Sequence, residues 1–455
     1  MALPQTPPNA IKIADVIDRS RIGSLQVTLF ALCAACLIMD GFDVQAVGYV
    51  GPSLIAEWKI PGSTLGNMLA SGNFGVLVGS LLFTMLADKI GRRPVLIAAT
   101  FYFSALTIAT GLVTSPQQMI VVRFVAGLGL GCIIPNGTAL IGEYSPRRLR
   151  VALMATISVG FTAGAAFGGF VSAWLIPEFG WRSVFFFGGA VPLVIAVLMI
   201  RSLPESLQFM ALQGARNRER LTKWLTRIDP TLRIGSATEF VIHEEHRGGV
   251  PAVHLFRDGR ALGTVLLWVV NFMNIFNLYV LSGWMPTVAT RLGYSTRTSV
   301  LVGTTVQVGG TLGTFWLTWL IGKFGFFRVL TACFTVACVS IALIGQPGLS
   351  LWLLILIVFI AGSCVVGGQP TINALSGSYY PTYLRSTGIG WGLGIGRAGA
   401  IIGPWLVGQF IALGWSIQDI FHMSAIPALI SAVVMLSLWW VMKPSTFANA
   451  EAVGH

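Results

Sequence analysis

The stretch SLQVTLFALCAACLIMDGFDVQAVGY, residues 24–49, decides what kind of protein this chain can form. It is an apolar run of more than twenty residues, long enough to cross the ~30 Å hydrocarbon core of a bilayer as a helix. The segment before it, residues 1–21, is polar and lacks the apolar core and small-residue cleavage site of a secretory signal peptide. We therefore expect a membrane span that the protein retains.

Apolar runs of similar length recur along the whole chain, and a polar stretch divides them into two sets of six. The runs lack the period-two alternation of barrel strands, so they are expected to be helices. We predict an all-α membrane protein with twelve transmembrane helices, near 24–49, 63–87, 94–113, 117–142, 151–174 and 182–201, and then near 261–285, 298–321, 327–346, 350–377, 386–411 and 418–442.

The composition points the same way. Only 10% of the residues are charged and 55% are hydrophobic, whereas a soluble domain has about 25% charged residues. A chain this poor in charge cannot cover a water-facing surface, which argues against a soluble enzyme. The formal net charge of +12 suggests a nucleic-acid partner at first sight, but the distribution of the basic residues argues against one.

The basic residues gather in alternate loops. By the positive-inside rule, the loops rich in Lys and Arg face the cytoplasm. We therefore expect both termini and the central loop to be cytoplasmic, in a bacterial inner membrane. The loops rich in basic residues hold Lys12, Arg19, Arg21, Lys89, Arg92, Arg93, Arg147, Arg148, Arg150, residues 201–260, Lys323, Arg328, Arg385 and Lys443. The loops on the other side hold only Lys59, Arg182, Arg291 and Arg297.

The central polar segment is interpreted as a linker between two halves. It contains a basic run at 216–220 and His-Glu-Glu-His at 243–246. The second motif does not have the H-E-x-x-H spacing of a zinc site, so we expect neither a metal nor a cofactor. The predicted organisation is an N-terminal segment, a six-helix bundle, a cytoplasmic central loop, a second six-helix bundle and a cytoplasmic tail, at 1–23, 24–201, 202–257, 258–442 and 443–455.

The two halves repeat each other at an offset of 234 or 235 residues. Parallel repeats of this kind build transporters whose substrate site lies near the membrane midplane, between two pseudo-symmetric bundles. The matched features are Gly75-x-x-x-Gly79 with Gly309-x-x-x-Gly313, residues 88–93 with 322–327, Pro135 with Pro370, residues 144–150 with 379–385, and Gly164 and Gly168 with Gly399 and Gly403.

Asp-Lys-Ile-Gly-Arg-Arg, residues 88–93, lies in the loop between the second and third predicted spans. Together with the duplicated halves, it resembles the cytoplasmic loop motif of the major facilitator superfamily. This chain departs from that pattern, with Thr84 where the family motif opens with Gly and Gly322 in the second copy where the first has Asp88. Gating is therefore expected to depend mainly on the first copy. The gating candidates are Asp88, Gly91, Arg92, Arg93, Glu143, Arg150 and Arg385.

Asp40-Gly41-Phe42-Asp43 lies inside the first span. A charged residue at the bilayer centre costs about 2.5–3.5 kcal/mol on insertion scales, and the spacing i, i+3 puts both carboxylates on one helix face. The segment resembles the D-G-[YF]-D signature of the aromatic acid:proton symporter family, in combination with Arg123, Glu143 and Arg397 elsewhere. That resemblance implies proton coupling through Asp40 and Asp43. The alternative is a structural polar pair that holds helices together.

Arg397 is flanked by small residues in the eleventh span, which leaves room for a carboxylate in a bidentate pair. The alternative is an internal ion pair with Asp40, Asp43 or Glu143. Asn residues at every third position of the seventh span form a polar stripe, which either lines a cavity or bonds neighbouring helices. The remaining substrate-binding candidates are Arg123, Asn271, Asn274, Asn277, Gln307, Trp391, Phe42 and Tyr279.

The resemblance implies a major facilitator fold and import of an aromatic acid of the benzoate, 4-hydroxybenzoate or protocatechuate type by proton symport. The expected partners are a small aromatic carboxylate, protons and the lipid bilayer, for a monomer that binds no nucleic acid. A facilitator for another organic anion or a sugar is the alternative, because Leu203-Pro204-Glu205-Ser206 has a loose likeness to sugar porters.

Overall fold

The structure, a computed structural model, describes residues 10–213, 217–232, 239–241, 252–381 and 383–441. Among them are twelve helical segments long and apolar enough to cross a membrane, which confirms the predicted all-α class and the number of spans. They are α2 (Ser24–Trp58), α3 (Gly62–Ile90), α4 (Arg92–Leu112), α5 (Pro116–Leu130) with α6 (Ile133–Tyr144), α7 (Arg147–Phe179), α8 (Arg182–Ser202), α11 (Ala261–Arg291), α12 (Thr296–Phe324), α13 (Phe326–Ile344), α14 (Leu351–Tyr379), α15 (Arg385–Ala412) and α16 (Ile417–Val441).

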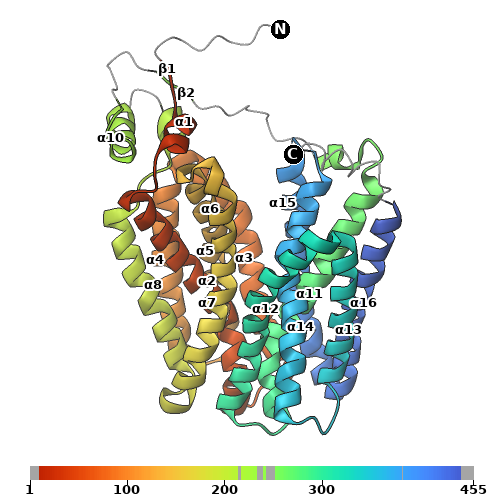
Figure 1. Cartoon of the computed structure of the whole chain (residues 1–455). Helices are drawn as coiled ribbons and strands as arrows, with labels where there is room; N and C mark the ends of the chain where they lie inside the picture. The colour runs from red at the N-terminus through yellow and green to blue at the C-terminus, as the bar shows by residue number, and fades with distance from the viewer. Residues whose placement is uncertain (1–9, 214–216, 233–238, 242–251, 382, 442–455) are drawn as a thin grey trace.

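Figure 1 shows two helical bundles side by side, one built from α2 to α8 and the other from α11 to α16. Large apolar side chains are exposed on their outer surfaces, among them Leu81, Phe315, Trp319 and Trp440. Exposed apolar area on this scale would be a liability in water, whereas in a bilayer it contacts lipid.

Glycines let helices within each bundle approach closely, at matching places in the two halves. A Cβ added to Gly164 of α7 would lie 2.0 Å from the carbonyl oxygen of Ile38 in α2. In the other half, a Cβ on Gly399 of α15 would lie 2.5 Å from the carbonyl oxygen of Phe272 in α11. Helix association in lipid depends on such close packing because lipid tails are as apolar as the side chains.

The two bundles contact each other in only part of their length. The backbone contacts between them lie toward the ends of the helices far from α1: a Cβ on Gly66 would meet Pro404 O at 3.0 Å, and one on Gly48 would meet Ser282 O at 3.0 Å. Nearer the middle, Asn73 Nδ2 donates to Ala400 O at 3.3 Å. Figure 1 shows the bundles converging at this end and separating toward α1.

Short elements lie at the α1 end of the two bundles, with the 3-10 turn η2 (Ala252–Phe256) against α11 and α15 of the second. Strand β1 (Ala10–Lys12) pairs in parallel with β2 (Glu239–Val241), and α1 (Ile13–Arg19) follows β1. In the central segment lie α9 (Leu207–Leu212), the amphipathic α10 (Arg218–Ile228) and η2. The linker interpretation did not anticipate these elements.

Three expectations from the sequence fall partly or wholly outside the described residues. They concern the basic run at 216–220, which begins one residue before the described segment 217–232, the His-Glu-Glu-His motif at 243–246 and the tail at 443–455.

We predict that Gly164→Val will lower the thermal stability of the purified protein in detergent, because the added side chain meets the α2 backbone. Overpacking of a close contact costs typically about 1–3 kcal/mol. Gly322→Val is the matched control, since no atom lies within 4 Å of a Cβ added there. Equal melting temperatures for the two variants would contradict the close-packing role of Gly164.

Candidate functional site

An ion pair between Arg123 and Asp43 lies buried inside the first bundle. Arg123 Nη2 donates to Asp43 Oδ2 at 2.8 Å and Nη1 donates to Oδ1 at 3.1 Å, with side chains 3% and 0% exposed. Thr107 of α4 adds a donor to Oδ1 at 2.8 Å. Arg123 and Asp43 were expected in substrate binding and proton coupling, but here each satisfies the other. This geometry favours the structural alternative for Asp43.

Asp40, one helical turn before Asp43, is equally buried at 2% exposure. Unlike Asp43, it has no ion pair or side-chain hydrogen bond to any residue that the structure describes. Its carboxyl group lies close enough to Asp43 and Arg397 for their charges to act on it. Asp40 is therefore the carboxyl group of α2 that forms no hydrogen bond or ion pair with the described residues.

Arg397 reaches this region from the other bundle, on α15. Among the described residues its guanidinium has no ion pair, because Asp43 is bonded to Arg123 and Glu143 is bonded to Arg92. Of the three internal partners considered from the sequence, Asp40 alone remains, within electrostatic range but not paired. A carboxylate from outside the protein would find this guanidinium available.

Tyr279 of α11 completes the group. Its hydroxyl lies within electrostatic range of both Arg397 and Asp40. No hydrogen bond joins this hydroxyl to another described residue. The structure thus brings together a cation, a phenol and a carboxyl group from α15, α11 and α2, that is, from both bundles. We call Asp40, Tyr279 and Arg397 the central triad.

The predicted Asn stripe on α11 divides into two parts. Asn271 and Asn274 bond to Gln369 of α14: Gln369 Nε2 donates to Asn271 Oδ1 at 3.0 Å, and Asn274 Nδ2 donates to Gln369 Oε1 at 2.7 Å. Asn277 lies elsewhere. With its amide oriented so that the nitrogen faces Ser424 O, Asn277 donates to that oxygen at 2.7 Å and accepts from the backbone N–H of Ala428 at 3.1 Å, both in α16.

For Asn277 the cavity-lining prediction therefore does not match the geometry. Helix α16 contains Pro427, which has no N–H and kinks a helix. The Asn277 side chain inserts into the backbone ladder next to that proline, so it serves interhelical bonding.

The remaining substrate candidates have local partners. Phe42 is fully buried and packs against Phe187 with ring centroids 5.7 Å apart, inside the first bundle. Gln307 Nε2 donates to Ser282 Oγ at 2.8 Å, joining α12 to α11. Trp391 is half exposed and stacks on Trp268 at 5.9 Å. Of these three, Trp391 is the one with a ring face still open.

Most gating candidates meet at the α1 end of the first bundle, where Arg92 forms an ion pair with Glu143. Glu205, which follows α8, holds this cluster together: its Oε1 accepts the backbone N–H groups of Arg92 and Arg93, both at 3.0 Å. These N–H groups begin helix α4, where a carboxylate is favoured by the helix dipole. Ser206 Oγ donates to Glu143 Oε2 at 2.6 Å.

Gly91 is required at this turn. Its φ is +103°, and an added Cβ would lie 2.6 Å from Glu205 Oε2. Sequence reasoning did not select Glu205 for this cluster, because Leu203-Pro204-Glu205-Ser206 was considered only as a sugar-porter feature. The sequence did carry a signal for this role of Glu205, because this carboxylate comes just after a span and faces the basic loop of the same bundle.

The side chains of Arg93, Arg150 and Arg385 do not bond to Glu143 or Glu205 in the described part of the chain. Arg93 Nη2 donates to Ile200 O at 2.6 Å, and Arg150 Nη2 donates to Ser145 O at 3.4 Å. Arg385 is exposed on the second bundle and has no ion pair within the described part of the chain. Asp88 lies in the last turn of α3, but its side chain is outside what the structure describes.

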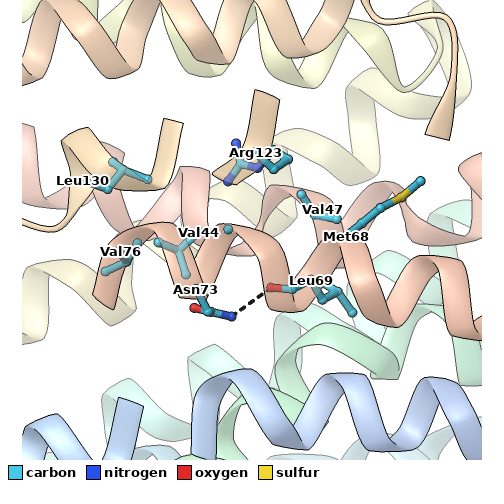
Figure 2. A pocket seen from close by; sticks show the side chains of 9 residues that line it. Val44, Val47, Met68, Leu69, Asn73, Val76, Arg123 and Leu130 are labelled. Atoms are coloured by element: carbon cyan, nitrogen blue, oxygen red, sulfur yellow. Dashed lines mark hydrogen bonds between the residues drawn. The ribbon is translucent and has the colours of Figure 1, made fainter. Parts of the chain in front are cut away.

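Figure 2 shows a small pocket inside the first bundle, between α2, α3 and α5. Arg123 and Asn73 are its polar members, and the other labelled side chains are apolar. Asn73 also bonds the backbone of α15. Because Arg123 is engaged by Asp43, this pocket offers apolar contact more than a free charge.

Comparisons with known proteins give a consistent result. A sequence model of the Major Facilitator Superfamily matches residues 33–404 and also 267–453. The chain is 35% identical over 422 residues to the 4-hydroxybenzoate transporter PcaK of Pseudomonas aeruginosa, covering 92% of this chain and 94% of that one. It is 34% identical over 430 residues to a gallate transporter of Pseudomonas putida, covering 94% and 95%.

Among solved structures, a D-xylose–proton symporter superposes with a TM-score of 0.70 at 17% identity, over 93% of this chain and 99% of that chain. The nucleoside transporter NupG gives a TM-score of 0.66 at 15% identity, over 92% and 99%. At these identities the likeness concerns the fold alone.

We predict that Asp43→Asn will destabilise the protein, because it strands the buried Arg123 guanidinium. Removing one partner of a buried ion pair costs about 3–5 kcal/mol. The double variant Asp43→Asn, Arg123→Gln should recover part of the loss, since neither charge remains. Thermal unfolding in detergent measures both. Asp40→Asn is the matched control and should change the melting temperature little; a drop as large as that of Asp43→Asn would mean that Asp40 is also paired.

Proposed function

The chain belongs to the Major Facilitator Superfamily, and from that premise we propose that it is a secondary transporter that imports an aromatic carboxylic acid together with protons. The relatives are named for transport of 4-hydroxybenzoate and gallate, and a third, a benzoate transport protein of Acinetobacter baylyi, is 29% identical over 432 residues, covering 93% of this chain and 92% of that one. One observation carries the proposal: the unpaired Arg397 of one bundle lies near the unpaired Asp40 of the other.

Arg397 binds the carboxylate of the acid in this proposal. A guanidinium presents parallel N–H groups that match both oxygens of a carboxylate, and such charge-assisted bonds are among the strongest in proteins. An unpaired cation inside a membrane span is expensive, so a substrate anion stabilises this arrangement. Tyr279, within range of Arg397, contributes a hydroxyl donor and an aromatic face to the same site.

Asp40 carries the coupled proton. Asp40 is buried without a bonded partner among the described residues, and the positive charge of Arg397 acts on it. Substrate binding neutralises the charge of Arg397, which is the charge that opposes protonation of Asp40. Proton uptake at Asp40 and binding of the acid at Arg397 therefore favour each other. Asp43 is held by Arg123 and keeps α2 in place beside α5.

Transport follows from the way the bundles meet. They contact at the end far from α1 and separate toward α1, and we propose that the central triad is reached from the α1 side in this conformation. Rocking of the two bundles about the triad would close that side and open the other. The Arg92–Glu143 pair and Glu205 fix the turn between α3 and α4 to the rest of the first bundle, so this turn is proposed to move with that bundle.

We further propose a bacterial inner membrane as the location, with the α1 end in the cytoplasm. The support is the excess of Lys and Arg in the loops at that end, as the positive-inside rule requires. On this topology the described conformation is open to the cytoplasm. The protein is proposed to act as a monomer, since each chain contains both bundles of one transport unit.

The rival substrates, a sugar or another organic anion, have less support. The sugar-porter likeness rested on residues 203–206, and in the structure Glu205 and Ser206 bond the helix-4 terminus and Glu143. That segment is distant in sequence from the residues of the triad, and it belongs to the cluster of gating candidates around Glu205. An anion with an aromatic ring suits a site that combines a guanidinium with a tyrosine.

Proton coupling is tested by uptake of radiolabelled 4-hydroxybenzoate into whole cells. We expect a protonophore to abolish accumulation against a gradient. Asp40→Asn should likewise lose accumulation but keep counterflow exchange, because binding at Arg397 does not need a titrating group at residue 40. Accumulation that survives the protonophore and requires sodium would refute the proposal.

The anion site is tested by measuring the affinity of purified variants for 4-hydroxybenzoate. Arg397→Ala should weaken binding by about 10- to 100-fold, the value of charge-assisted hydrogen bonds. Arg397→Lys should also weaken it, because an ammonium lacks the planar fork. Arg328→Ala is the control, since Arg328 of α13 lies over the ring of Trp439 of α16, outside the triad. Near-normal affinity in Arg397→Ala would assign Arg397 a structural role.

A further inference from the structure

Four amide side chains of the second bundle form one hydrogen-bonded group, which we call the amide cluster: Asn271 and Asn274 of α11, and Gln369 and Asn373 of α14. Besides the two bonds that join α11 to Gln369, Gln369 Nε2 donates to Asn373 Oδ1 at 3.4 Å. Asn271 Nδ2 donates to Leu267 O at 3.1 Å, and Asn274 Nδ2 donates to Val365 O at 3.1 Å.

One atom of the cluster lacks a partner. Asn274 is 2% exposed, and both of its N–H groups are bonded, but its carbonyl oxygen accepts no hydrogen bond from the residues that the structure describes. A buried acceptor without a donor is unfavourable and therefore rare in folded proteins. Gln369 cannot supply the donor as arranged, because both of its N–H groups are also engaged.

Asn277 shows what a purely structural amide looks like on the same helix. One turn after Asn274, it uses its nitrogen and its oxygen on the backbone of α16. Asn274 differs in having a free acceptor. That difference points to a group that arrives from outside the protein.

The cluster lies next to the part of α15 that carries Arg397. A Cβ added to Gly392 would lie 3.3 Å from Asn271 Nδ2, and one added to Gly396 would lie 3.4 Å from Asn271 O. Arg397 directly follows Gly396. Gln369 and Asn373 are partly exposed, whereas Asn271 and Asn274 are buried, so the cluster extends from the bundle interior to its surface.

The chemistry of the open position selects a class of group. A carbonyl oxygen attracts a hydrogen-bond donor and repels a carboxylate, and amides do not titrate, so the cluster favours a neutral donor. A phenolic hydroxyl is such a donor, since its pKa near 10 keeps it protonated at neutral pH. It also has lone pairs that can accept a bond from an amide N–H.

We propose that the amide cluster binds the ring hydroxyl of a hydroxylated aromatic acid, with Asn274 Oδ1 as the acceptor, while Arg397 binds the carboxylate. This inference rests on the proposed function and specifies which aromatic acids the site prefers. Acids that carry a ring hydroxyl are bound more tightly than their unsubstituted counterparts.

The test compares the affinities of purified protein for 4-hydroxybenzoate, 4-methoxybenzoate and benzoate. The unaltered protein should bind 4-hydroxybenzoate about tenfold more tightly than benzoate, the value of one well-formed hydrogen bond. The methoxy compound, which has no donor, should bind no more tightly than benzoate. Asn274→Ala should weaken binding of 4-hydroxybenzoate about tenfold and change the affinity for benzoate less than twofold.

Asn373→Ala serves as a second variant because residue 373 is partly exposed and its loss should not prevent folding; it should also weaken 4-hydroxybenzoate selectively. Asn277→Ala is the matched control and should not change the ratio of the two affinities. Equal weakening of both acids by Asn274→Ala and Asn373→Ala, or tight binding of the methoxy compound, would overturn the inference. Failure of the unaltered protein to bind any of the three acids would instead overturn the proposed function.

Discussion

A buried charge in a lipid-facing protein must be matched, and that constraint organises this molecule. The cost of an unpaired ion in hydrocarbon is several times the net value of a neutral hydrogen bond. Asp43 is therefore held by both terminal nitrogens of Arg123 and by Thr107. Glu143 is likewise held by Arg92 and Ser206. Once these are accounted for, Asp40 and Arg397 stand out, because nothing described in the protein bonds to either.

The same constraint explains why function is divided between the bundles. The two halves repeat, so Asp40 and Asp43 of α2 correspond by the 234-residue offset to Asn274 and Asn277 of α11. In each half, the later residue is locked into its own bundle: Asp43 to Arg123, Asn277 to α16. The earlier residue has unused bonding capacity in both halves. One half thus offers a carboxyl group at this position, and the other offers a neutral amide.

Glycine makes this arrangement movable. Within each bundle, glycines bring helix backbones into contact along their length, as Gly164 does with α2 and Gly399 with α11. Between the bundles, contacts such as Gly66 with Pro404 occur at one end only. Rigid bundles that share a limited interface can rock against each other without repacking their interiors. The charged cluster around Glu205 lies at the opposite end, within the first bundle, where it fixes the loop before α4.

The sequence by itself determined that lipid is the solvent and how many spans there are, because the length and apolar content of each run are local properties that lipid imposes directly. It showed the duplication as well, because matching residues recur at a fixed offset along the chain. It also pointed to Asp40, Asp43, Arg123, Glu143 and Arg397, since charges within apolar runs are conspicuous. Which of these charges neutralise one another was beyond its reach, because the pairs join residues 80 and 51 positions apart. The separation of Asn277 from Asn274, the burial of Phe42 and the capping role of Glu205 likewise depend on which helix lies opposite. Only the tertiary structure decides that, because it alone sets which partners a side chain can reach.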